Sequence, residues 1–200
     1  MRLIFATNNS GKLKEMKAIL EGLNIDISTA KEIGVTLDIV EDGTTFEENA
    51  LKKARFVAEK SKEWAIADDS GLCIKALDNA PGVFSARWAG EGASDEEIIR
   101  HTLGKIKDIP EEKREAWFET VVALVTPDGK HWIFKGRVEG RIAKTPCGKP
   151  RPKLPYDLIF IPEGRDQTFA EISDKEKNTL GPRGLALKQL KEFLEKFYQG

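Results

Sequence analysis

In Ala65-Ile66-Ala67-Asp68-Asp69-Ser70-Gly71-Leu72-Cys73-Ile74, two adjacent carboxylates separate two apolar runs. This pattern predicts a strand, a tight acidic turn and a second strand. Two neighbouring negative charges disfavour each other unless a positive charge lies close by. A hard divalent cation held by carboxylate oxygens is the usual partner. The residues alone leave open whether Asp68 and Asp69 form a metal or general-base site or only a solvated acidic loop.

A second polar segment follows the first apolar run of the chain. Residues 3–6 read as a buried strand, Thr7-Asn8-Asn9-Ser10-Gly11-Lys12 as a polar turn, and residues 13–20 as a helix. A helix N-terminus offers free N–H groups and the positive end of the helix dipole, so this turn is a candidate phosphate site. The turn is not a P-loop, because Leu13 stands where Ser or Thr would bind metal. A plain strand–helix turn with Asn caps is the alternative.

Composition excludes several classes of protein. The 200 residues fit a single α/β domain over residues 1–200, and 40% hydrophobic residues suffice for a sizeable core. With 32% charged residues and a net charge of −1, the chain shows no bias toward nucleic acid or membrane surfaces. We expect neither a membrane span nor a signal peptide.

The rare residue types narrow the chemistry. Cys73 and Cys147 are far apart and lack metal-ligand spacing, so we expect a reducing, cytoplasmic location. His101 and His131 are the only histidines, which disfavours a His-based triad or a zinc site.

Hydrophobic periodicity, capping residues and turn signals predict the remaining elements. They are a helix to residue 60 with a capping box of Thr44 and Glu47, a helix over 95–106 capped by Ser94, strands over 117–126 and 131–142 joined by a turn at 127–129, a loop over 145–155, a strand over 158–161 and a helix over 182–198. This order predicts an α/β fold: a mixed sheet flanked by helices, divided into two lobes with a cleft.

Other charged residues have ordinary explanations. Glu41 lies in an acidic turn, Lys53 on the polar face of a helix, and Lys177 in a charged run, all typical of solvated surface. Arg183 is different, because a cation in the first turn of a helix opposes the helix dipole. That placement favours a ligand near Arg183.

Taken together, several motifs in order along the chain resemble the inosine triphosphate pyrophosphatase family. They lie at residues 5–12, 41–50, 67–72, 81–87, 138–142, 156–157, 168–171, 176–177 and 183–187. The resemblance implies an elongated mixed α/β fold with a cleft and a homodimer. It also implies Mg²⁺-dependent cleavage of inosine, deoxyinosine or xanthosine triphosphate to the monophosphate and pyrophosphate.

The resemblance also implies a role for each matching residue. Glu41 and Asp69 would bind Mg²⁺, with Asp69 also the general base and Asp68 and Lys12 completing the catalytic group. The residues that would contact the nucleotide are Thr7, Asn8, Asn9, Ser10, Gly11 and Lys12 at the triphosphate, with Lys53 and Ser70, and Leu154, Tyr156, Asp157, Lys177, Pro182 and Arg183 toward the base and sugar.

The chain departs from the family pattern where the base is read. The family usually has Gly-Phe-Gly-Tyr-Asp where this chain has Lys153-Leu154-Pro155-Tyr156-Asp157, and Ser-His-Arg where it has Gly181-Pro182-Arg183. The ring that would stack on the base and two polar side chains are therefore replaced. Two alternatives follow: a pyrophosphatase with relaxed or redirected base specificity, and a catalytically weak nucleotide-binding protein. The intact Glu41, Asp68, Asp69 and Lys12 argue against the second.

Overall fold

The computed structural model describes residues 2–199. Its strands are β1 (Arg2–Phe5), β2 (Asp26–Thr29), β3 (Trp64–Ile74), β4 (Glu115–Val125), β5 (His131–Ile142) and β6 (Phe160–Pro162). Its α-helices are α1 (Ser10–Ile19), α2 (Phe46–Ser61), α3 (Asp95–Lys105), α4 (Asp174–Leu180) and α5 (Pro182–Gln199). None of the described helices is both long enough and apolar enough to cross a membrane.

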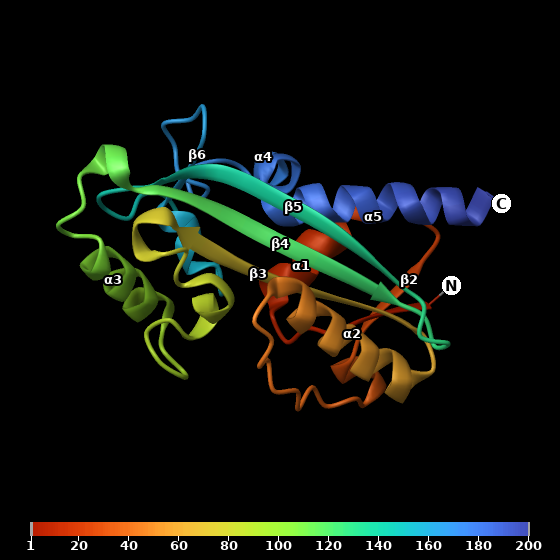
Figure 1. Ribbon diagram of the computed structural model, residues 1–200. Helices are drawn as coiled ribbons and strands as arrows, with labels where there is room; N and C mark the ends of the chain where they lie inside the picture. The colour runs from red at the N-terminus through yellow and green to blue at the C-terminus, as the bar shows by residue number, and fades with distance from the viewer. Residues whose placement is uncertain (1, 200) are drawn as a thin grey trace. The chain divides into compact units, whose positions relative to one another are not determined.

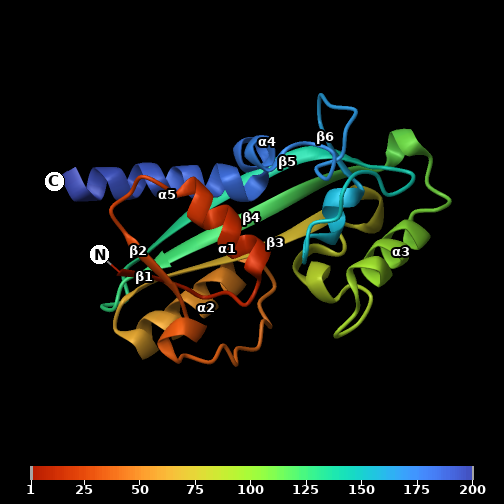
Figure 2. The ribbon, with the colours of Figure 1, turned by 180° about the vertical axis from the view of Figure 1, so that it is seen from behind.

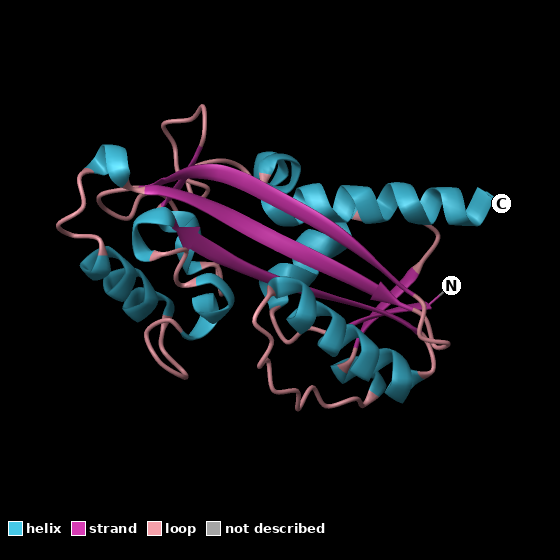
Figure 3. Cartoon of the chain, in the orientation of Figure 1, coloured by secondary structure: helices cyan, strands magenta, loops and turns pink. Residues whose placement is uncertain are grey.

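The six strands form one sheet in the order β2-β1-β3-β4-β5-β6 (Figures 1 and 3). β1 pairs parallel with β2 and β3, whereas β5 pairs antiparallel with β6. The sheet is therefore mixed and carries flanking helices, as the sequence predicts. The turn between β4 and β5 is closed by the Thr126 N–H, which donates to the Lys130 carbonyl at 2.9 Å, and this confirms the predicted hairpin.

The chain divides into two compact units. The first contains the chain up to Asp69, Thr120–Gly136 and the chain from Arg183 onward. Here α1 and α5 cover one face of the sheet, and α2 covers the other (Figures 1 and 2). The core on the α1 and α5 side combines residues of these helices and of β1, β3, β4 and β5: Leu3, Phe5, Met16, Leu20, Ile66, Val122, Leu124, Phe134, Ala186, Leu187, Leu190 and Leu194.

The second unit contains Ser70–Glu119 and Arg137–Pro182. Its core packs α3 against the strands and the loop segment before β6: Leu72, Ile74, Ile98, Ile99, Ile106, Ala116, Ile142, Tyr156, Ile159, Phe160, Phe169 and Ile172. Its α-helices are α3 and α4, and several loops connect its elements (Figure 3). The predicted cap of α3 is confirmed, because Ser94 and Glu97 form a complete capping box.

The acidic pair does not lie in a turn. β3 runs without interruption from Trp64 to Ile74, and both carboxylates are buried within it. The prediction of two strands and a tight turn was wrong here, because it treated the charges as exposed. Cations from distant segments neutralise them instead, so the strand can continue.

Two helix starts also differ from the prediction. α1 begins at Ser10 rather than Leu13, because the Asn9 side chain caps it. α2 begins at Phe46, and its capping box pairs Thr45 with Glu48 rather than Thr44 with Glu47. Both frames satisfy the sequence signature. In the observed frame the Thr45 hydroxyl accepts from the Glu48 N–H at 3.1 Å, and the Glu48 carboxylate accepts from the Thr45 N–H at 3.2 Å.

Three smaller differences concern short elements. β2 and α4 were not predicted, since they have four and seven residues and weak periodicity. The late strand begins at Phe160 rather than Leu158, because Pro155–Leu158 forms a single turn of 3-10 helix.

Candidate active site

Successive side chains of a strand point to opposite faces of the sheet. Within the first unit, this rule sends Asp68 toward α1 and α5, and Asp69 toward α2. The observed contacts agree: Asp68 meets Lys12 and Arg183, whereas Asp69 meets Asn49 and Lys53. One strand thus serves two separate groups of charges.

Asp68 is held between two cations. Its Oδ2 atom lies 2.9 Å from Lys12 Nζ and 3.2 Å from Arg183 Nε. Arg183 also forms an ion pair with Glu15 of α1. Burial alone would raise the pKa of Asp68, but the charges of Lys12, Arg183 and Lys53 outweigh burial and hold this pKa well below its ordinary value. Asp68 is therefore a fixed negative charge that organises Lys12 and Arg183.

Asp69 has a different environment. Its Oδ2 accepts a hydrogen bond from Asn49 Nδ2 at 3.1 Å, and its Oδ1 lies 3.7 Å from Lys53 Nζ. Burial raises the pKa of Asp69, a shift that Glu41 reinforces and that the charges of Lys53 and Lys12 do not fully oppose. The carboxylate of Asp69 thus binds a proton more readily than that of Asp68.

Lys53 connects Asp69 with Glu41. Its ammonium lies 3.1 Å from Glu41 Oε2, and the two carboxylates raise the pKa of Lys53 even though its burial would lower it. Two carboxylates that share one cation provide the hard oxygen ligands that Mg²⁺ prefers. No cluster of three or more His, Cys, Asp or Glu side chains able to hold a metal occurs among the described residues. Mg²⁺ commonly uses one or two carboxylates and takes its other ligands from water and substrate phosphates, so Glu41 and Asp69 fit this ion.

The expected phosphate turn is capped from within the chain. Asn9 Oδ1 accepts hydrogen bonds from the N–H groups of Gly11 at 2.9 Å and Lys12 at 3.2 Å. Thr7 Oγ1 in turn accepts from the Asn9 N–H at 3.1 Å, while the side chains of Asn8 and Ser10 are exposed. Two N–H groups expected to face an anion therefore donate to Asn9. The Lys12 side chain, 18% exposed, is the charged group of this segment.

Most residues expected at the base end belong to the second unit, whereas Arg183 belongs to the first. Lys177 Nζ lies 2.7 Å from Asp157 Oδ2, and Arg151 lies 3.5 Å from the same oxygen. Both Asp157 and Lys177 are buried, so the expected solvated surface is wrong at Lys177. It is also wrong at Lys53, which is buried as well. The Tyr156 hydroxyl donates to the Ser85 carbonyl at 2.8 Å, and burial raises the pKa of this phenol.

The structure shows the surroundings of the three positions that depart from the family pattern. Leu154 is half-buried, and Pro182 is buried at the start of α5. A Cβ atom on Gly181 would lie 2.7 Å from the Lys177 carbonyl oxygen, which is closer than Cβ atoms approach other atoms. The backbone here is therefore fitted to glycine and does not accept the Ser of the family pattern without a shift.

Comparison with known proteins decides the family. The sequence model of the Ham1 family matches residues 3–193. The chain belongs to the Ham1 family. It is 42% identical over 203 residues to a protein named dITP/XTP pyrophosphatase from Leuconostoc mesenteroides subsp. mesenteroides, covering 100% of both chains. It is 45% identical to a protein of the same name from Bacillus subtilis, covering 96% of each.

Solved structures agree with the assignment to the Ham1 family. The HAM1 protein from Coxiella burnetii superposes with a TM-score of 0.89 at 41% identity, covering 98% of this chain and 99% of that one. The expected mixed α/β fold is thereby confirmed.

Sequence reasoning missed three residues of these clusters in the Ham1 chain. They are Glu15 beside Arg183, Asn49 beside Asp69, and Arg151 beside Asp157. Asn49 carried a usable signal, because it is a polar residue on the buried face of α2 between Phe46 and Ala50. Glu15 and Arg151 carried none, since each lies among other charged or polar residues.

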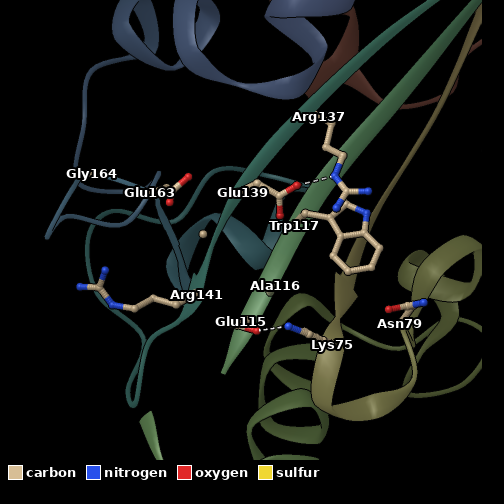
Figure 4. A pocket seen from close by; sticks show the side chains of 11 residues that line it. Lys75, Asn79, Glu115, Ala116, Trp117, Arg137, Glu139, Arg141, Glu163 and Gly164 are labelled. Carbon is tan, nitrogen blue, oxygen red and sulfur yellow. Dashed lines mark hydrogen bonds and ion pairs between the residues drawn. The ribbon is translucent and has the colours of Figure 1, made fainter. Parts of the chain in front are cut away.

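A surface pocket of about 630 Å³ in the second unit contains none of the expected site residues (Figure 4). The Arg137 guanidinium stacks over Trp117, 4.2 Å from its ring centre, and pairs with Glu139 at 2.6 Å. Lys75 pairs with Glu115 at 2.6 Å. These charges balance one another, so the pocket offers no net charge to a nucleotide.

Proposed function

We propose that this protein hydrolyses nonstandard purine nucleoside triphosphates (ITP, dITP and XTP) to the monophosphate and pyrophosphate, with Mg²⁺ as cofactor. The proposal rests on the different partners of two neighbouring carboxylates in β3. Asp68 forms ion pairs with Lys12 and Arg183, whereas Asp69 and Glu41 both lie near Lys53. The names of the relatives, dITP/XTP pyrophosphatase, support the same reaction.

The proposed roles follow from these contacts. Lys12, oriented by Asp68, is the candidate to bind phosphate oxygens and to stabilise charge on the departing pyrophosphate. Asp69 is the candidate to accept a proton from the attacking water. When bound by Glu41 and Asp69, Mg²⁺ would supply a Lewis acid at the phosphate. Lys53 lies between these two carboxylates and offsets their charge.

We assign base and sugar recognition to Tyr156, Asp157 and Lys177, and a contact with the substrate to Ser70. The ion pair of Asp157 and Lys177 is buried, and buried polar groups can reject a base that leaves them without partners. Leu154 and Pro182 replace the stacking ring and the imidazole. This observation favours a second candidate, a pyrophosphatase with relaxed base specificity.

The proposal also includes a homodimer and a cytoplasmic location. A homodimer is supported by the family resemblance alone. A cytoplasmic location is supported by the two cysteines, Cys73 and Cys147, which are both free thiols.

A nucleotide panel tests the proposal. ITP, dITP, XTP, GTP and ATP are incubated with the protein with Mg²⁺ and with excess chelator, and pyrophosphate and orthophosphate are quantified separately. We expect pyrophosphate from the first three substrates and none in chelator. Orthophosphate as the first product, or full activity in chelator, would overturn the proposed reaction. Binding of every nucleotide without turnover would instead identify a nucleotide-binding protein.

A further inference from the structure

We propose that Asn49 is a positioning residue that fixes the Asp69 carboxylate against the turn that carries Glu41. The inference rests on the proposed function, because it takes Glu41 and Asp69 as the metal-binding pair. It adds a residue that acts through Asp69 rather than on the nucleotide.

Both polar atoms of the Asn49 side chain form hydrogen bonds. The Nδ2 group donates to Asp69 Oδ2 at 3.1 Å, and Oδ1 accepts from the Gly43 N–H at 2.9 Å. Gly43 is two residues from Glu41 in the chain. A single side chain of α2 therefore connects the strand that carries one carboxylate with the turn that carries the other.

Burial makes these two hydrogen bonds obligatory. Asn49 has no exposed surface and lies among apolar residues of α2. Burying an amide is unfavourable unless its polar atoms find partners. The two bonds therefore specify one rotamer of Asn49, and that rotamer specifies where Asp69 Oδ2 is held.

The turn approaches Asn49 so closely that it requires glycine. A Cβ atom on Gly43 would lie 2.6 Å from Asn49 Oδ1 and 2.8 Å from the Cβ of Glu48. Any larger residue must displace either the turn or the Asn49 amide. The close contact therefore depends on both residue types, glycine at position 43 and asparagine at position 49.

Mg²⁺ explains why such a device is useful. This ion demands near-ideal octahedral geometry, so two carboxylates from separate segments must be held in register. Lys53 bridges them through its ammonium, but an ammonium imposes little direction on its partners. The Asn49 amide supplies direction. Loss of a group that orients a metal ligand typically weakens metal binding about 10–100-fold.

The test measures metal binding directly rather than turnover. Mn²⁺ is titrated into the nucleotide-free wild-type protein and into Asn49→Leu, and free Mn²⁺ is followed by electron paramagnetic resonance. Leucine has a similar size but forms neither hydrogen bond. We expect about 10–100-fold weaker Mn²⁺ binding in Asn49→Leu. The KM for ITP at saturating Mg²⁺ should change far less than the half-saturating Mg²⁺ concentration.

A second variant and a matched control separate positioning from stability. Gly43→Ala keeps the Asn49 amide but pushes against it, and we expect it to weaken Mn²⁺ binding in the same direction. This variant decides the matter if Asn49→Leu does not fold. Ser94→Ala removes the capping box of α3 in the second unit, so it should lower the melting temperature of the metal-free protein without weakening Mn²⁺ binding.

The outcomes distinguish this inference from the proposed function. A wild-type protein that releases pyrophosphate and binds Mn²⁺, beside variants that bind it equally well, overturns the role of Asn49 alone. A wild-type protein that neither binds Mn²⁺ at millimolar concentration nor needs a divalent cation for turnover overturns the metal site and the inference together.

Discussion

Asp68 and Asp69 are neighbours in the chain, yet they have separate partners and opposite pKa shifts. Strand alternation places them on opposite faces of the first unit, where α1 and α5 supply Lys12 and Arg183 on one side and α2 supplies Asn49 and Lys53 on the other. Similar carboxylates therefore serve different purposes: a fixed counter-charge and a candidate base.

Asp69→Asn should abolish turnover and preserve the fold. The change keeps the shape of the side chain and can still accept the hydrogen bond from Asn49, but it removes the charge that would bind metal and accept a proton. We expect kcat to fall roughly 100-fold or more. Because burial disfavours the charged form of Asp69, unfolding by urea in chelator should show no loss of stability. A wild-type kcat in a folded variant would contradict this assignment.

Asp68→Asn should instead destabilise the protein. Removing a partner from a buried ion pair costs about 3–5 kcal/mol, and we expect the lower end because Arg183 keeps Glu15 and Lys12 is partly exposed. The pKa of Asp68 is lowered by folding, so its contribution is present above the unfolded pKa of about 4 and is lost as the pH falls below it. The difference in urea stability between wild type and variant should shrink on acidification. A constant difference would show that the charge is not the cause.

Among the helices and strands, the sequence predicts best those whose formation depends on residues close together in the chain. The α3 cap, the β4–β5 turn and the long periodic helices α2 and α5 are set by neighbouring residues, so the sequence identified them. The uninterrupted β3 depends on Lys12 and Arg183, which lie far away in the chain, and no local pattern reports such a partner. The role of Asn49 could not be predicted for the same reason. The sequence shows a polar residue on the buried face of α2, but its hydrogen bond to Asp69 depends on how α2 packs against β3.

The starting frame of α2 is tested by two single substitutions. Thr45→Ala removes the side chain that accepts the Glu48 N–H and should cost about 0.5–2 kcal/mol of unfolding free energy. Thr44→Ala loses only an exposed contact to the Glu48 carboxylate and should cost less. Chemical denaturation of both variants gives the comparison. An equal or larger loss for Thr44→Ala would favour the frame that begins one residue earlier.

Across the whole chain, the family resemblance alone predicts site roles for Glu41, Asp69, Lys12, Lys53, Asp157 and Lys177. The structure brings Glu41, Lys53 and Asp69 together in the first unit and pairs Asp157 with Lys177 in the second. The base preference could not be predicted equally well. The family residues proposed to read the base are replaced at Leu154, Gly181 and Pro182, where this chain departs from the pattern that carries the resemblance.

Base discrimination should increase when the family residues are restored. Leu154→Phe with Pro182→His offers a ring for stacking, worth about 1–3 kcal/mol per base elsewhere, and an imidazole for a polar contact. Gly181 stays unchanged, since a side chain there would meet the Lys177 carbonyl. We expect the ratio of kcat/KM for ITP over ATP to rise in the double variant. An unchanged ratio would mean that these positions do not read the base.

In the proposed reaction, water attacks the α-phosphorus directly and pyrophosphate leaves. Hydrolysis of ITP in ¹⁸O-labelled water, followed by mass spectrometry of both products, tests it most directly. Direct attack at the α-phosphorus places the label in inosine monophosphate and leaves the pyrophosphate unlabelled. Label in the pyrophosphate, or labelled orthophosphate as the first product, would contradict the account.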